Sequence, residues 1–387
     1  MTEKRKSEEI TPFLVMDVLE RALELEEEGR SIIHMEIGEP DFDTPPAIVE
    51  AAVISLRKGE THYTDSRGML ELRKAIADYH RSKYGVELGP ERIFVTMGVS
   101  SALLAVLSTL IEEPGDEIII SDPYYPCYPN FIKHLRGTPK LIKTRAEDGF
   151  HLKPEQVEEA AGERTRGILI NSPSNPVGTV MPEEDLRDVC QLGIPVISDE
   201  IYHGLVYGEE DHSALEYTDN AFVLNGFSKL FAMTGWRLGY AITPEEAARE
   251  THICLQNLFI SPNPFVQRGG IEALRGNHPE IEDMKKKYDA RRRFMLERLS
   301  GMGLHCRVEP KGAFYIFVNA SHIDGDSYRL AFDMLENAGV ALAPGIDFGE
   351  QGEGYLRVSY ANSMENIEIG AERLKEYLSK REKPQNQ

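Results

Sequence analysis

Cysteine is scarce in this chain, with four residues among 387. Cys127, Cys190, Cys254 and Cys306 are far apart, no two form a C-x-x-C pair, and none has the Cys/His spacing of a metal site. This pattern excludes a scaffold built on disulfides or structural zinc. We expect reduced thiols and no metal.

Long apolar runs are also missing. No stretch approaches the roughly eighteen apolar residues of a membrane span, and the first residues, M-T-E-K-R-K-S-E-E, lack the apolar core of an export signal. Acidic residues outnumber basic ones: the chain has 64 Asp and Glu and 43 Lys and Arg, which gives a net charge of -21. We therefore expect a cytoplasmic protein that binds neither nucleic acid nor membranes.

The order of helical and strand patterns predicts the fold. Short apolar runs alternate with helix-period segments from Pro45 to about Arg275, which is typical of an α/β fold with a mainly parallel sheet and helices on both faces. A charged helix is predicted over 279–300, before a smaller α+β region. We expect an N-terminal arm that joins the small domain (1–44), a large domain (45–280) and a small domain (281–387). The tail after Lys380 is predicted to be disordered.

The segment N-G-F-S-K-L-F-A-M-T-G-W-R-L-G-Y, residues 225–240, surrounds Lys229 with apolar side chains. Desolvation, together with the nearby cation Arg237, favours the neutral amine, which is the form that condenses with a carbonyl. A lysine in an S-K dipeptide can also be an ordinary loop residue, so the other segments decide.

Polar residues follow two other strand-like runs. Asp199 and Tyr202 follow the run 194–198, and Asn171 and Asn175 follow the run 167–170. Ligands bind at the carboxyl ends of strands in open α/β sheets. These side chains are therefore candidates for one site, although an Asp after a strand is often a helix cap and an N-P pair is often just a turn.

The segment T-M-G-V-S-S predicts an anion site. A helix that opens at Val99 and Ser100, directly after a Gly98 turn, points free backbone N–H groups and its dipole at an anion. The alternative is an ordinary helix capped by Ser100 or Ser101. No G-x-G-x-x-G follows any strand-like run, which disfavours a nicotinamide enzyme.

From G-E-P-D-F at 38–42 to R-V-S-Y-A at 357–361, the chain resembles the fold-type I pyridoxal-phosphate enzymes, close to the class I/II aminotransferases. The resemblance implies that Lys229 holds pyridoxal 5'-phosphate as an internal aldimine. It also implies that Asp199 pairs with the pyridinium nitrogen, and that Tyr202 and Asn175 hydrogen-bond to the phenolic oxygen of the ring.

Other cofactor contacts follow from the same resemblance. It implies a phosphate site made by Val99, Ser100, Ser228 and Arg237, and a ring stacked on Tyr125. Tyr63 is expected to reach the phosphate of the neighbouring subunit's cofactor, which implies a homodimer with active sites at the interface.

Arg357 lies in the run G-Y-L-R-V-S-Y-A, whose other residues are uncharged. A guanidinium there needs an anionic partner, and a carboxylate binds it with two parallel hydrogen bonds. The resemblance makes Arg357 the clamp for the α-carboxylate of an amino acid, with Gly38 and Asn175 beside it. An internal salt bridge is the alternative.

The expected activity is ping-pong transfer of an amino group from an amino acid to a 2-oxo acid. Aspartate-specific relatives have a second cation, either a lysine where this chain has Ser100 or an arginine from the partner subunit, and residues 257–265 contain no basic residue. We therefore expect a neutral or aromatic donor, in a pocket lined by Phe13, Ile37, Tyr63, Tyr125 and Phe348.

Three alternatives remain beside this expectation. Aspartate transamination and a C-S or β-lyase reaction would share the cofactor site. A non-catalytic module of a transcriptional regulator is disfavoured, because no winged-helix or basic segment precedes residue 10.

Overall fold

The computed structural model describes residues 10–381. Its largest element is a seven-stranded sheet in the order β2-β8-β7-β6-β5-β3-β4, in which β8 alone runs antiparallel to its neighbours. The fold-class prediction is confirmed. The strands are β2 (Ile93–Thr96), β3 (Glu117–Asp122), β4 (Thr138–Lys143), β5 (Thr165–Asn171), β6 (Val196–Asp199), β7 (Ala221–Gly226) and β8 (Gly239–Ile242).

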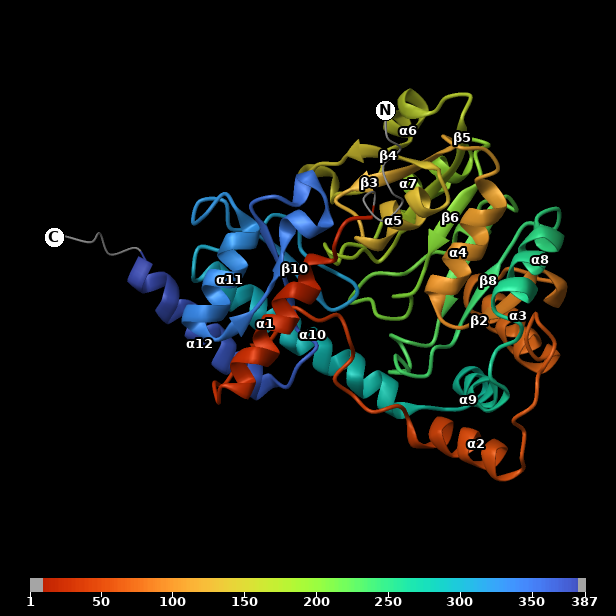
Figure 1. The fold of residues 1–387 in the computed structure, drawn as a ribbon, viewed down its shortest axis with the longest axis horizontal. Helices are drawn as coiled ribbons and strands as arrows, with labels where there is room; N and C mark the ends of the chain where they lie inside the picture. Colours follow the sequence, from red (N-terminus) through yellow and green to blue (C-terminus); the bar gives the residue numbers. More distant parts are fainter. Residues whose placement is uncertain (1–9, 382–387) are drawn as a thin grey trace, which may run out of the picture.

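Both faces of this sheet are covered, which explains why its central strands are buried along their whole length (Figure 1). Two glycines let one helix approach closely, since a Cβ at Gly269 or Gly270 would lie within 3 Å of Trp236 or Leu238. The surrounding helices are α2 (Pro46–Arg57), α3 (Leu70–Tyr84), α4 (Val99–Leu110), α5 (Cys127–His134), α6 (Pro154–Ala160), α7 (Glu183–Cys190), α8 (Ala248–Leu258) and α9 (Pro264–Arg275).

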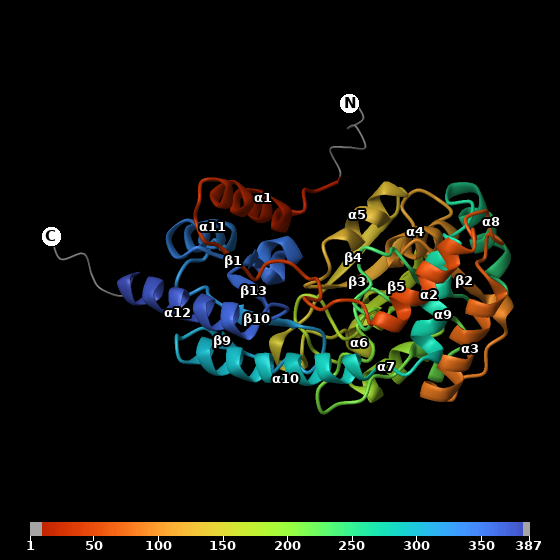
Figure 2. The same cartoon turned by 90° about the horizontal axis from the view of Figure 1, so that it is seen from below.

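A second, four-stranded antiparallel sheet has the order β12-β13-β10-β9. Figure 2 shows this sheet with its helices at one end of the molecule, and α10 runs from there toward the large sheet. Its elements are β9 (His305–Cys306), β10 (Tyr315–Asn319), β12 (Ala343–Pro344), β13 (Tyr355–Ser359), α10 (Pro279–Ser300), α11 (Ser327–Ala338) and α12 (Met364–Arg381).

The N-terminal segment packs on this second region. Helix α1 (Leu14–Glu27) contacts α11, and β1 (Ile33–His34) pairs in parallel with β11 (Val340–Ala341). The chain then crosses to α2, which packs against α9. The site described below therefore lies where the N-terminal segment passes between the two sheets.

The predicted helix 279–300 coincides with α10, and the strand-like runs 167–170 and 194–198 lie within two residues of the bounds of β5 and β6. Periodicity did not indicate α1, α5, α6, α8, α9 or β4. The tail after Lys380, which is predicted to be disordered, lies outside the described residues except for Arg381, the last residue of α12. The absence of an export signal concerns residues 1–9, which also lie outside them. Over residues 10–381, no helix combines the length and apolarity of a membrane span.

Candidate active site

A cavity of about 770 Å³ gathers nearly all the predicted site residues. It is bordered by the ends of β6 and β7, the start of α4 and side chains of β10 and β13. The predicted residues that line it are Gly38, Val99, Ser100, Tyr125, Asn175, Asp199, Tyr202, Ser228, Lys229, Arg237 and Arg357. Tyr63 lies apart from it and is 81% exposed.

Lys229 projects into this cavity from the loop after β7. Its Nζ atom donates a hydrogen bond of 2.6 Å to the carbonyl oxygen of Gly38 and lies 5.9 Å from the ring centroid of Tyr202. Desolvation lowers the pKa of Lys229 to about 8; Glu39 opposes this shift, and the positive charges of Arg357 and Arg237 add to it. The amine is therefore closer to its neutral, nucleophilic form than an ordinary lysine.

Asp199 ends β6 and is buried in the floor of the cavity. Its carboxylate accepts hydrogen bonds from the Tyr128 hydroxyl at 2.7 Å and from the Ile201 N–H at 3.2 Å. Burial raises the pKa of Asp199 to about 6, and these two donors partly offset the shift. Tyr128 was not predicted as a site residue, although it lies only three residues after Tyr125, in the first turn of α5.

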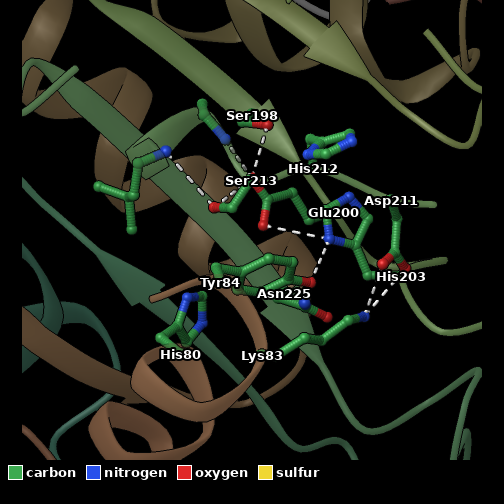
Figure 3. Close-up of polar contacts among 12 residues, drawn as sticks. His80, Lys83, Tyr84, Ser198, Glu200, His203, Asp211, His212, Ser213 and Asn225 are labelled. Atoms are coloured by element: carbon green, nitrogen blue, oxygen red, sulfur yellow. Dashed lines mark hydrogen bonds and ion pairs between the residues drawn. The ribbon is translucent and has the colours of Figure 1, made fainter. Parts of the chain in front are cut away.

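A buried polar cluster outside the cavity anchors the turn that carries Asp199 and Tyr202. Figure 3 shows Glu200 and His203 in a buried polar cluster with residues of α3 and the 211–213 loop. Glu200 Oε1 accepts hydrogen bonds from the hydroxyl groups of Ser198 and Ser213, both at 3.0 Å, and His203 Nδ1 lies 2.7 Å from the Tyr84 hydroxyl. Burial raises the pKa of Glu200 to about 8 and lowers that of His203 to about 4.

Asn171 connects this turn to the neighbouring loop. Its side chain donates to the carbonyl oxygen of Asp199 at 3.0 Å and accepts from the N–H of Asn175 at 2.8 Å. Asn175 Oδ1 in turn accepts from Arg357 Nη1 at 2.8 Å. The ends of β5 and β6 are thus joined to each other and to β13.

The start of α4 has the local geometry predicted for an anion site. Gly98 has φ +82°, and no side chain caps the helix after it, because the Ser101 hydroxyl donates to the Gly98 carbonyl instead. The alternative of a serine-capped helix is therefore wrong. A Cβ at Gly98 would lie 2.5 Å from Arg237 Nη2, so the guanidinium packs directly against this glycine.

Arg357 is 2% exposed and lies between two aromatic rings. Its guanidinium carbon is 4.5 Å from the ring centroid of Tyr315 and 4.8 Å from that of Phe348. Its amino groups donate to Asn175 and to the carbonyl oxygen of Glu36, whereas Nε has no partner. No carboxylate within residues 10–381 forms a salt bridge with Arg357, so the internal salt bridge considered above is not found.

The pocket prediction is wrong for one side chain. Phe348 does not line the cavity, because it is fully buried behind Arg357. Phe13, Ile37 and Tyr125 do line it, and further apolar walls come from Val15, Met16, Leu103 and Phe131.

Comparison with known proteins gives the family. The model of aminotransferase class I and II matches residues 30–374. The (5-formylfuran-3-yl)methyl phosphate transaminase of Methanocaldococcus jannaschii is 44% identical over 95% of this chain and 97% of its own. The aspartate/prephenate aminotransferase of Thermus thermophilus is 36% identical, over 97% and 98% respectively. A crystal structure from Methanococcus jannaschii, described as similar in its active site to kynurenine aminotransferases, has 43% identity and a TM-score of 0.90, with 97% of this chain and 99% of that chain covered.

Members of this family depend on pyridoxal 5'-phosphate, and the side chains of the cavity fit that cofactor. The uncapped start of α4 with Arg237 suits a phosphate, the buried carboxylate of Asp199 suits a protonated ring nitrogen, and the amine of Lys229 suits an aldehyde. The chain belongs to the class I and II aminotransferases and is a pyridoxal-phosphate-dependent transaminase.

Proposed function

We propose that this transaminase takes its amino group from a neutral or aromatic amino acid and gives it to a 2-oxo acid. The observation that carries the proposal is the charge of the cavity. Among the described residues that line it, the cations are Lys229, Arg237 and Arg357. The first two suit the cofactor, which leaves Arg357 for a single carboxylate. The lining of the cavity also includes the apolar side chains named above.

Arg357 orients the substrate in this proposal. A carboxylate can accept two parallel hydrogen bonds from one guanidinium, which would hold the amino acid in one plane. The rings of Tyr315 and Phe348 keep that plane fixed. Asn175, which already contacts Arg357, lies beside the bound carboxylate.

Lys229 is the proposed covalent attachment point and proton carrier. With the cofactor bound, its neutral Nζ atom would take the proton from the substrate Cα and pass it on within the same half-cycle, and in the second half-cycle it would carry a proton in the opposite direction, to the Cα of the new amino acid. Bound pyridoxal phosphate supplies an electron sink for that deprotonation. Asp199 keeps the ring nitrogen protonated, Tyr202 donates toward the phenolic oxygen, and Tyr125 packs on the ring. Val99, Ser100, Ser228 and Arg237 hold the phosphate.

The names of two relatives point to other substrates than the proposed ones. The Thermus thermophilus relative is an aspartate/prephenate enzyme, and the relative at 44% identity acts on a phosphate-bearing aldehyde. Arg357 could bind a phosphate in place of a carboxylate, so that aldehyde class is the second candidate for the acceptor. A lyase reaction would release ammonia without any acceptor.

The test is a half-reaction screen with the purified holoenzyme. Single amino acids are added, and loss of the absorbance band of the lysine-bound cofactor is followed. Alanine, a branched-chain amino acid or phenylalanine should react faster than aspartate. Lys229→Ala should abolish this band and turnover while cofactor is still retained. A wild-type preference for aspartate would contradict the donor proposal, and ammonia release without an acceptor would show a lyase.

We further propose a homodimer, to which Tyr63 contributes from the partner side. An apolar hollow of about 710 Å³ runs along α2 and the start of α9, and Val49 and Leu56 on α2 are 40% and 46% exposed. Leu56→Glu should therefore yield monomers in sedimentation equilibrium. Leu141→Glu, at a site 43% exposed on β4, is the matched control and should stay dimeric. Monomeric wild-type protein would contradict the proposal.

The domain bounds at residues 44 and 280 and the cytoplasmic location stay predictions. The contacts of α1 with α11, and of α2 with α9, support the first division.

A further inference from the structure

Tyr315 was not indicated by the sequence, yet it touches several groups of the site. It begins β10 in the small sheet and is 1% exposed. Its hydroxyl group lies 2.8 Å from the hydroxyl group of Tyr202, which belongs to the turn after β6. A side chain of the small sheet therefore contacts Tyr202, a proposed cofactor contact that follows a strand of the large sheet.

The hydroxyl group of Tyr315 is packed tightly against the backbone of Gly38. A Cβ at Gly38 would lie 2.0 Å from it, so the backbone at Gly38 must be bare for the tyrosine to fit. Tyr202 supplies the one hydrogen bond of this hydroxyl within the described residues. If Tyr315 donates to Tyr202, the proton of Tyr202 is left free to point into the cavity.

The ring of Tyr315 has a second contact. Tyr315 pairs with Ser359 on β13, and Arg357 lies two residues away on that strand. The guanidinium carbon of Arg357 lies 4.5 Å from the centroid of this ring and 4.8 Å from that of Phe348. An aromatic face attracts a desolvated cation and fixes its plane.

We infer that Tyr315 is a positioning residue with two separable roles. Its hydroxyl group directs the Tyr202 phenol toward the cofactor, and its ring holds Arg357 in the plane that receives the substrate carboxylate. This inference rests on the roles proposed above for Tyr202 and Arg357. A single residue, Tyr315, would thus position both the proposed cofactor contact Tyr202 and the proposed carboxylate contact Arg357.

The two roles are separated by two substitutions. Tyr315→Phe keeps the ring and removes the hydroxyl, so the pH midpoint of the bound cofactor's absorbance change should rise by roughly 0.5 to 1 pH unit. Affinity for a carboxylate should change less than about twofold in this variant, because the stack on Arg357 remains. Phe348→Leu keeps the hydroxyl and removes one face of the stack. It should weaken carboxylate affinity by about fivefold and leave the midpoint unchanged.

The probe is 3-phenylpropanoate, a carboxylate without an amino group, with propanoate as the version that lacks the side chain. Its dissociation constant is measured from the cofactor spectrum of the holoenzyme. Tyr207→Phe is the matched control, because it also removes a buried hydroxyl hydrogen bond, to the Ala313 carbonyl, but lies outside the cavity. It should change neither quantity. Tyr315→Met, which lacks both ring and hydroxyl, should change both.

The inference fails if Tyr315→Phe leaves the midpoint at the wild-type value, or if Phe348→Leu binds the probe as wild type does. Should Phe348→Leu not fold, Tyr315→Phe and Tyr315→Met are compared instead, and equal probe affinity in these two proteins would overturn the role of the ring. Failure of the proposed function is distinguishable, since it would show in the wild type as absence of the cofactor band or of amino transfer.

Discussion

Tyr128 donates a hydrogen bond of 2.7 Å from its hydroxyl group to Oδ2 of Asp199. This is the side-chain donor to a carboxylate that also accepts a hydrogen bond from the Ile201 N–H, and burial already raises the pKa of Asp199 to about 6. A carboxylate that must face a protonated ring nitrogen has to remain ionised. Tyr128 therefore supports the charge that the cofactor needs.

Tyr128→Phe should raise the pKa of Asp199 further and weaken its hold on the ring nitrogen. We expect kcat/KM to fall about tenfold, the scale of one hydrogen bond to a charged group. Tyr124→Phe, in the same segment but without a hydrogen bond to Asp199, should retain wild-type kinetics. Equal activity of Tyr128→Phe and wild type would show that the contact is not needed.

Lys229 should reveal its lowered pKa in the cofactor-free protein. The neutral amine is the reactive form, so the rate of reaction with pyridoxal phosphate should rise through pH 8 and level off near pH 9. Between pH 7 and pH 9 the neutral fraction of such a group rises about tenfold, whereas that of an ordinary lysine rises about a hundredfold. The pH dependence of the reagent cancels in the ratio of this rate to that of N-acetyllysine, and the ratio should therefore fall about tenfold between pH 7 and pH 9. A ratio that stays constant over this range would contradict the lowered pKa.

Arg357→Lys should impair the substrate more than the cofactor. An ammonium cannot form the two parallel hydrogen bonds of a guanidinium or stack between Tyr315 and Phe348 in the same way. We expect kcat/KM for the amino acid to fall by two orders of magnitude or more, on the scale of about 3 kcal/mol. The dissociation constant of pyridoxal phosphate should stay near the wild-type value. Unchanged kinetics would assign Arg357 a structural role.

Glu200 should make the folded protein less stable as pH rises. Its pKa is raised to about 8 in the folded protein, above about 4.3 in an unfolded chain, so between these values only the folded state keeps the proton. The contribution of this proton to stability is complete below pH 4.3 and is lost as pH rises toward 8, at about 1.4 kcal/mol per pH unit. His203 stays neutral in this window, since its pKa is lowered to about 4.

Glu200→Gln keeps a carbonyl acceptor for Ser198 and Ser213 but cannot titrate. Its free energy of unfolding relative to wild type should therefore increase between pH 5 and pH 8, as measured by urea unfolding at each pH. Glu183→Gln, on the surface beside Arg187, is the control and should show no such trend. Parallel pH profiles of wild type and Glu200→Gln would mean that Glu200 is ionised in the folded protein.

The sequence predicted those parts of the site that local patterns encode. Asp199, Asn175 and Lys229 each follow a strand, and parallel strands bring their carboxyl ends to one edge, so chain order alone placed them together. Tyr315 escaped prediction, and Phe348 was wrongly placed in the pocket wall, because the contacts of both with Arg357 join segments far apart in the sequence. Helix α9 was missed for a related reason, since its glycines are poor helix formers that tertiary packing against Trp236 and Leu238 retains.

The final prediction concerns Ser100, which lies in the first turn of α4, is exposed and lines the cavity. A second carboxylate on the substrate would enter an apolar region without a partner, which costs several kcal/mol. Ser100→Lys places a cation there, and should raise kcat/KM for aspartate relative to alanine at least tenfold, the scale of a charge-assisted hydrogen bond of about 1.5 kcal/mol or more.

Ser100→Met is the matched control, because it adds a long side chain without charge and should leave the ratio unchanged or lower it. The comparison separates charge from bulk at one position. An equal ratio in the lysine and methionine variants would mean that the substrate side chain does not approach α4. If wild-type protein already favoured aspartate, a cation from outside these lining residues, such as one of the partner subunit, would have to bind the second carboxylate.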